Sequence, residues 1–167
     1  MSGTAGLPVK WPMADAKHRP DSLQLEHFVP FRLNRLADAL SVNLSEIYRD
    51  RFGLDIPEWR ILVTVGQREA CTAQFVAAST RMHKTRVSRA VASLEARKLL
   101  VRTVNRTDGR EMALELTREG RRMYAALVPL ALLRESQLLS CLSRAERVAF
   151  LAAVAKLEAS LALRHDE

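Results

Sequence analysis

The basic excess of this 167-residue chain lies in one short segment. Between Arg81 and Arg110, nine lysines and arginines stand against two acidic residues, a net charge of +7 that equals the net charge of the whole chain. The remaining residues therefore carry as many bases as acids. Charge that only keeps a protein soluble is spread over its surface, whereas charge confined to one segment is typical of a site that binds a polyanion.

Residues 83–100 have the apolar spacing of an amphipathic helix. Four apolar residues recur at intervals of three and four and predict one buried stripe: Val87, Ala90, Val91 and Leu94. The opposite face is centred on Thr85 and Arg89 and flanked by Arg86 and Ser88, so its first half carries basic and hydroxyl side chains. An arginine can bind guanine through two hydrogen bonds, and hydroxyls reach phosphates or base edges, so this face suits the major groove of DNA. A solvated basic helix is the alternative, because such helices are common.

The residues after this helix predict a β-hairpin. Residues 99–104 are β-prone, residues 105–109 have the chemistry of a turn, and residues 110–116 return with alternating apolar side chains. Arg106 and Arg110 would then lie at the tip of the hairpin. A hairpin with basic residues at its tip, directly after a basic helix, is the wing of a winged helix-turn-helix.

Residues 72–80 predict a short helix just before the basic one, and a tight connection at Arg81 joins the two. A short helix, a tight turn and a basic helix make a helix-turn-helix, whose second helix enters the major groove. The three pieces in this order favour duplex DNA binding over a merely solvated basic helix.

Five short motifs accompany this arrangement: Pro57-Glu58-Trp59-Arg60-Ile61-Leu62, Lys84-Thr85-Arg86-Val87-Ser88-Arg89, Leu94-Glu95-Ala96-Arg97-Lys98-Leu99-Leu100-Val101, Asp108-Gly109-Arg110 and Leu116-Thr117-Arg118-Glu119-Gly120. Together they resemble the MarR family of bacterial transcriptional regulators. The family has an Asp-x-Arg in the wing and Leu-Thr six residues after that arginine, and Arg110 and Leu116-Thr117 keep this spacing. The resemblance covers about residues 28–163.

The resemblance implies DNA contacts for particular side chains. A role in reading the major groove falls on Lys84, Thr85, Arg86, Ser88 and Arg89, and a role at the minor groove or backbone falls on Arg106 and Arg110. The chain departs from the family pattern at the turn, where Arg81 replaces the usual glycine, and before Lys84, where His83 replaces a frequent aspartate. Non-glycine residues tolerate a positive φ poorly, so Arg81 puts the usual turn conformation in question while adding a candidate phosphate contact.

The rest of the chain predicts long helices on both sides of this centre. Residues 28–52 have a continuous apolar side, Asp55 begins a second helix, Thr117 a third that reaches about Cys141, and Ser143 a fourth through a capping box. The predicted fold is mainly α with a small β-hairpin wing, in which a winged helix-turn-helix lobe joins a helical dimerisation lobe. The predicted domains are an irregular N-terminal arm at 1–27, a helical dimerisation region at 28–54 and 118–164, and the DNA-binding domain at 55–117.

The terminal helices would leave much apolar surface exposed in an isolated chain, and burial of such surface favours association. The resemblance likewise implies an obligate homodimer, whose two recognition helices would meet major grooves about 34 Å apart. We therefore expect a pseudo-palindromic double-stranded DNA operator. Repression is favoured over activation, because blocking a promoter requires no surface for contacting the polymerase.

The resemblance also implies a small-molecule pocket where the dimerisation helices meet the DNA-binding lobe. The candidate residues are His18, Arg19, Phe28, Phe31, Arg32, Arg35, Trp59 and Arg60. An arginine beside aromatic rings suits an aromatic carboxylate, so the predicted effector is a small aromatic acid or its coenzyme A thioester. The alternatives are that Phe31 and Trp59 are core residues and that Arg32 and Arg35 form a solvated face or dimer salt bridges.

Other classes of protein are disfavoured. The histidines are scattered singly and no hydrolase or metal-ligating spacing occurs, so we expect no enzyme activity, metal or cofactor. Without an apolar run of 18 residues or a signal peptide, we expect no membrane association and a cytoplasmic location. Cys71 and Cys141 are predicted to be inert buried thiols, with a redox-responsive regulator as one alternative. A non-specific architectural nucleic-acid binder is another, although the basic face lacks the aromatic residues that single-strand and RNA platforms use.

Overall fold

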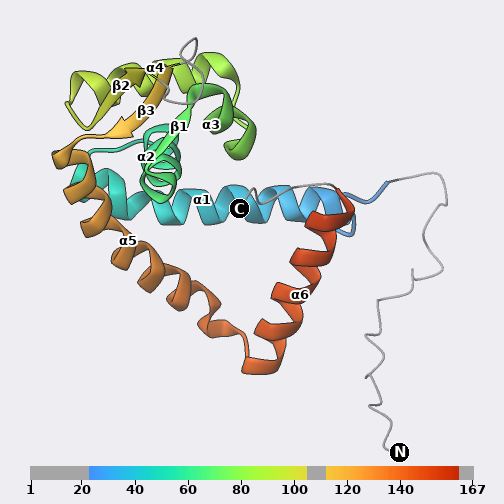
Figure 1. Cartoon of the computed structure of the whole chain (residues 1–167). Helices are drawn as coiled ribbons and strands as arrows, with labels where there is room; N and C mark the ends of the chain where they lie inside the picture. Colours follow the sequence, from blue (N-terminus) through green and yellow to red (C-terminus); the bar gives the residue numbers. More distant parts are fainter. Residues whose placement is uncertain (1–22, 105–111, 162–167) are drawn as a thin grey trace, which may run out of the picture. The chain divides into compact units, whose positions relative to one another are not determined.

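A computed structural model describes residues 23–104 and 112–161 of the chain, and it confirms a mainly α fold with a small antiparallel sheet (Figure 1). The elements in chain order are α1 (Val29–Phe52), α2 (Ile56–Arg68), β1 (Ala70–Thr72), α3 (Ala73–Thr80), α4 (Lys84–Ala96), β2 (Leu100–Val104), β3 (Met112–Leu116), α5 (Arg118–Leu138), the 3₁₀ turn η1 (Leu139–Cys141) and α6 (Arg144–Ser160). Contacts group the chain into two units, Met1–Ala39 and Leu40–Glu167, with the boundary inside α1.

The helix starts follow from side chains that satisfy the free N–H groups of each first turn. At the start of α2, the backbone N–H of Glu58 donates to Asp55 Oδ1 and the N–H of Asp55 donates to Glu58 Oε2, both at 2.8 Å. Ser143 and Glu146 form the same reciprocal capping box at the start of α6. Thr117 caps α5 by accepting the N–H of Gly120 at 3.0 Å. The predicted starts of these three helices are therefore confirmed.

The sheet is antiparallel in the order β1-β3-β2. β2 and β3 form the predicted hairpin, with Val104 opposite Met112 at its described end. The sequence did not reveal β1, a strand of three residues whose Ala70 pairs with Glu115 on the other edge of β3. The connection that contains Arg106 and Arg110 lies outside the described residues.

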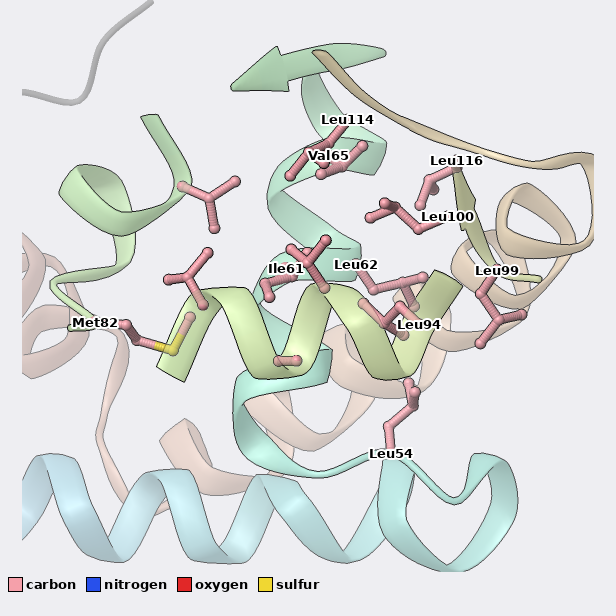
Figure 2. Close-up of a cluster of buried hydrophobic side chains, with 14 of the residues drawn as sticks. Leu54, Ile61, Leu62, Val65, Met82, Leu94, Leu99, Leu100, Leu114 and Leu116 are labelled. Atoms are coloured by element: carbon pink, nitrogen blue, oxygen red, sulfur yellow. The ribbon is translucent and has the colours of Figure 1, made fainter. Parts of the chain in front are cut away.

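The main hydrophobic core forms where α4 packs on α2 and the sheet. The predicted stripe of α4 is buried: Val87, Ala90, Val91 and Leu94 are at most 5% exposed. Figure 2 shows Leu94 in one cluster with Leu62 of α2 and with Leu114 and Leu116 of β3. Full burial of a leucine or valine stabilises a fold by roughly 1.5–3 kcal/mol. The same packing fixes which face of α4 remains open.

By contrast, α5 and α6 bury little of their apolar surface within one chain. Leu132 and Leu133 of α5 are 58% and 57% exposed, and Val148 and Leu151 of α6 are 63% and 52% exposed. α6 has no buried residue. No single helix among the described residues is long and apolar enough to cross a membrane, and only the bent pair formed by α5 with η1 and α6 reaches that length and composition together.

Candidate nucleic-acid interface

The turn between α3 and α4 is built on an arginine in the left-handed conformation. Arg81 ends α3 with a φ of 55°, and its N–H donates to the carbonyl of Ala78 at 3.3 Å. The left-handed region costs a non-glycine residue about 1–2 kcal/mol. The tight connection predicted from the sequence is thus formed with Arg81 in the place of glycine, and its side chain is exposed.

The basic helix α4 begins at an unusual cap. His83 is its N-cap residue, and its Nδ1 accepts the backbone N–H of Thr85 at 3.3 Å. An acceptor Nδ1 requires the neutral imidazole, with its proton on Nε2. Histidine therefore supplies here the acceptor that Ser, Thr, Asp or Asn usually supplies at an N-cap.

The first two turns of α4 carry, outside its buried stripe, the side chains predicted to read DNA. All five are exposed: Lys84, Thr85, Arg86, Ser88 and Arg89. None of their side chains forms a hydrogen bond or ion pair with another described residue. Three cations and two hydroxyls without side-chain partners among the described residues can donate to phosphates and base edges without first breaking bonds within this part of the chain.

Other arginines of the same segment are used within the protein. Arg102 Nε lies 3.1 Å from Glu95 Oε1. The guanidinium of Arg97 donates to two backbone carbonyls, those of Phe52 and Gly53. Within the described residues, the basic segment is thus divided: Arg97 and Arg102 hold elements together, whereas no side-chain partner is found there for Arg81, Lys84, Arg86, Arg89 and Lys98.

Of the predicted wing, the structure describes the two strands. β2 ends at Val104 and β3 begins at Met112, and Thr103 Oγ1 donates to Glu115 Oε1 across the two strands. Arg106 and Arg110 lie outside the described residues, so their contacts with DNA stay a prediction.

Four of the predicted ligand residues belong to the first unit. Phe28, Phe31, Arg32 and Arg35 lie at or near the start of α1, and the guanidinium carbon of Arg35 is 5.7 Å from the centroid of the Phe31 ring. Phe31, Arg32 and Arg35 share a surface hollow of about 620 Å³ with Glu26 and three apolar residues: Val29, Leu33 and Leu36. Two further candidates, His18 and Arg19, lie outside the described residues.

The other two predicted ligand residues belong to the second unit. The Trp59 ring stacks on Tyr48, with 5.1 Å between ring centroids and an interplanar angle of 8°. Burial raises the pKa of the Tyr48 hydroxyl, and the charge of Arg60 partly opposes this effect. Arg60 Nη2 donates to Ser41 Oγ at 3.4 Å. Trp59 therefore packs against the core, which favours the alternative role considered for it.

A larger hollow of about 840 Å³ lies between α2, the sheet and the start of α5, and none of the predicted ligand residues lines it. Its volume is within the usual range of small-molecule sites. Its polar lining, however, sets Arg121 beside Glu69 and Glu115, and two carboxylates repel an anionic ligand. Short sequence motifs gave no sign of this hollow, because its residues come from separate elements.

The cysteines differ from each other. Burial raises the pKa of the Cys71 thiol to about 11, against the lowering effect of Arg68, so Cys71 is a neutral and weakly nucleophilic thiol at pH 7. The predicted burial of Cys141 was wrong: it is exposed at the end of η1, where no other part of the described chain covers it. Among the described residues, no group of three or more His, Cys, Asp or Glu side chains could hold a metal ion.

Comparison with known proteins gives the same fold. The family model of the MarR family matches residues 52–111, which include α2, the turn between α3 and α4, α4 and the strands β1 and β2. A MarR/EmrR family transcriptional regulator from Acinetobacter sp. ADP1 is 27% identical, with 85% of this chain and 100% of that chain covered and a TM-score of 0.75. No curated protein matches the chain.

Two further crystal structures share the fold at lower identity. A putative MarR family regulator from Listeria monocytogenes, complexed with 26mer DNA, is 19% identical, with 81% of this chain and 89% of that chain covered and a TM-score of 0.71. CouR from Rhodococcus jostii RHA1, bound to p-coumaroyl-CoA, is 21% identical, with 82% and 94% covered and a TM-score of 0.71.

Proposed function

We propose that this chain, whose residues 52–111 match the MarR family model and which shares its fold with MarR family transcriptional regulators, is a dimeric, ligand-responsive repressor. It binds a pseudo-palindromic operator through the exposed face of α4 and leaves it when a small aromatic acid or its coenzyme A thioester binds. Repression follows from occupying promoter DNA, which requires no further partner.

The observation that carries the DNA-binding part is the contrast between the two faces of α4. One face is buried against α2 and the sheet, whereas Lys84, Arg86 and Arg89 outside that face are exposed and have no partner among the described residues. Arg102, by contrast, is paired with the carboxylate of Glu95. Cations held unpaired on a rigid helix are available to a polyanion.

The dimer is supported by the exposed apolar side chains of the long helices. Leu33 and Leu36 of α1 are 44% and 46% exposed, and Leu132 and Leu151 of the later helices are more than half exposed. Exposed apolar surface on this scale marks an interaction site. A two-fold dimer would cover it and would present two copies of α4 to successive major grooves.

The first prediction tests DNA recognition. An operator is selected from a pool of random duplexes with the full-length protein, and its affinity is measured for Arg89→Ala by fluorescence anisotropy. We expect a loss of about 1–3 kcal/mol together with a relaxed base preference at one position of each half-site. Arg102→Ala removes the same charge from a paired arginine and should leave base preference unchanged. Operator affinity that survives both Arg89→Ala and Arg86→Ala would show that α4 does not read the groove.

The aromatic-acid effector is supported by the hollow at the start of α1. There the Arg35 guanidinium and the Phe31 ring lie side by side, a pairing that can bind a carboxylate and stack on an aromatic ring. CouR, which has the same fold, is bound to a thioester of an aromatic acid. A ligand changes DNA affinity only if it binds the DNA-incompetent state more tightly than the competent one.

The second prediction tests the effector. Operator complexes are titrated with benzoate, p-coumarate and p-coumaroyl-CoA, and with acetyl-CoA as a thioester that lacks the ring. We expect at least one aromatic compound to release the DNA, and we expect Arg35→Ala to raise the required concentration by about 10- to 100-fold, because hydrogen bonds to charged groups contribute about 1.5–3 kcal/mol. If none of the aromatic compounds releases the DNA, the aromatic-acid proposal is wrong, while DNA binding itself is unaffected.

A further inference from the structure

A buried carboxylate of α2 bonds to the C-terminal end of α4. Glu58 of α2 is 6% exposed, and its Oε1 accepts the hydroxyl of Ser93 of α4 at 2.6 Å. Its Oε2 accepts the N–H of Asp55 at 2.8 Å and lies 3.5 Å from Arg97 Nη1. Each oxygen of this carboxylate therefore has a partner, and the partners join the start of α2 to the end of α4.

Arg97, the C-cap residue of α4, extends these contacts to α1. Its Nη1 donates to the carbonyl of Gly53 at 2.9 Å, and its Nη2 donates to the carbonyl of Phe52 at 2.7 Å. Phe52 is the last residue of α1, and Gly53 follows it with a φ of 61°. The last carbonyls of a helix lack partners within the helix and carry its negative dipole end, so a guanidinium is well suited to them.

We infer that Glu58, Ser93 and Arg97 form a positioning latch, which holds α4 in register with the end of α1 and the start of α2. The latch does not touch DNA: the guanidinium of Arg97 is occupied by carbonyls and a carboxylate, unlike the unpaired guanidinium of Arg89. Its function is to set where the reading face of α4 lies. This inference rests on the proposed function and adds to it the residues through which a change in α1 or α2 reaches α4.

The geometry requires an arginine. Two carbonyls and one carboxylate surround the Arg97 guanidinium, and a planar fork can donate to several acceptors at once, whereas a lysine ammonium on a flexible stem cannot reproduce that arrangement. Arg97→Lys therefore keeps the charge, but we expect it to change the position of α4 relative to the end of α1 and the start of α2. Arg102→Gln is the matched control for charge, since Arg102 pairs only with Glu95 on α4 itself.

The experiment compares the affinities of full-length proteins for the selected operator and for a scrambled duplex of the same composition. For Arg97→Gln and Arg97→Lys we expect the ratio of the two affinities to fall about tenfold, as for the loss of one base contact, with non-specific affinity and salt dependence unchanged. Arg102→Gln should keep the ratio. Thermal melts establish the folded fraction, and where Arg97→Gln fails to fold, Arg97→Lys and Ser93→Ala supply the measurement.

Two results would overturn the latch. If both affinities fall together, the salt slope drops by about 0.9 per subunit and lysine restores binding, then Arg97 is a phosphate contact. If stability falls while the affinity ratio stays at the wild-type value, the contacts only stabilise the fold. Failure of the wild-type protein to select any duplex is a different outcome, because it contradicts the proposed function itself.

Discussion

Replacing Gly120 with alanine is expected to lower the free energy of unfolding by about 3 kcal/mol or more, although the same change inside most helices stabilises them. Gly120 lies in the first turn of α5, and a Cβ atom added there would stand 1.9 Å from the backbone carbonyl oxygen of Leu99. Backbone cannot rotate out of the way as a side chain can, so α5 must move from the α4–β2 connection. Urea denaturation followed by circular dichroism measures the change.

Gly66→Ala in α2 provides the matched control. There the added Cβ would meet the ring of Tyr124 at 2.6 Å, but that ring is a partly exposed side chain, and we expect a smaller loss of about 1–2 kcal/mol. If Gly120→Ala is neutral or stabilising, α5 does not press on the connection after α4. Its attachment would then rest on Thr117, whose hydroxyl donates to the Lys98 carbonyl and whose N–H donates to Leu99.

The close approach of Gly120 to Leu99 could not be predicted from the sequence, whereas the helices and the hairpin could. The helices and the hairpin depend on local patterns: apolar spacing on α4, capping boxes at Asp55 and Ser143, and turn residues between the strands. These patterns are properties of neighbouring residues, and the structure confirms the helices and the pairing of β2 with β3, while the turn residues lie outside the described part of the chain. β1 was missed because a strand of three residues is too short for a periodic signal and exists only through its pairing with β3.

The site divides in the same way. Exposure of the reading face of α4 could be predicted, since it follows from the apolar stripe on the other side. The structural role of Arg97 could not be predicted. In the sequence Arg97 looks like Arg89, and it differs because folding brings it to the carbonyls of Phe52 and Gly53, more than 40 positions away. Cys141 was wrongly expected to be buried because thiols usually are. Whether a thiol is buried depends on which distant residues pack over it, and the sequence near η1 does not show this.

Replacing Leu151 with glutamate is expected to dissociate the proposed dimer and to reduce operator affinity to that of an isolated half-site. Leu151 is 52% exposed on α6, which has no buried residue in the single chain. In a two-fold interface the substitution occurs twice, and each copy loses about 2 kcal/mol of apolar burial and adds a charge that is costly to bury. A total of about 4 kcal/mol weakens dimerisation about a thousandfold. Sedimentation equilibrium measures dimerisation, and anisotropy measures operator binding.

Ala149→Glu is the matched control. It places the same charge on the side of α6 that carries Lys156, seven residues later, and this side points away from Leu151. We expect this variant to remain dimeric and to bind the operator as the wild type does. A Leu151→Glu protein that stays dimeric would exclude this face of α6 from the interface. One that becomes monomeric but keeps full operator affinity would contradict the paired half-sites, since affinity gained by joining two copies of α4 is lost when they separate.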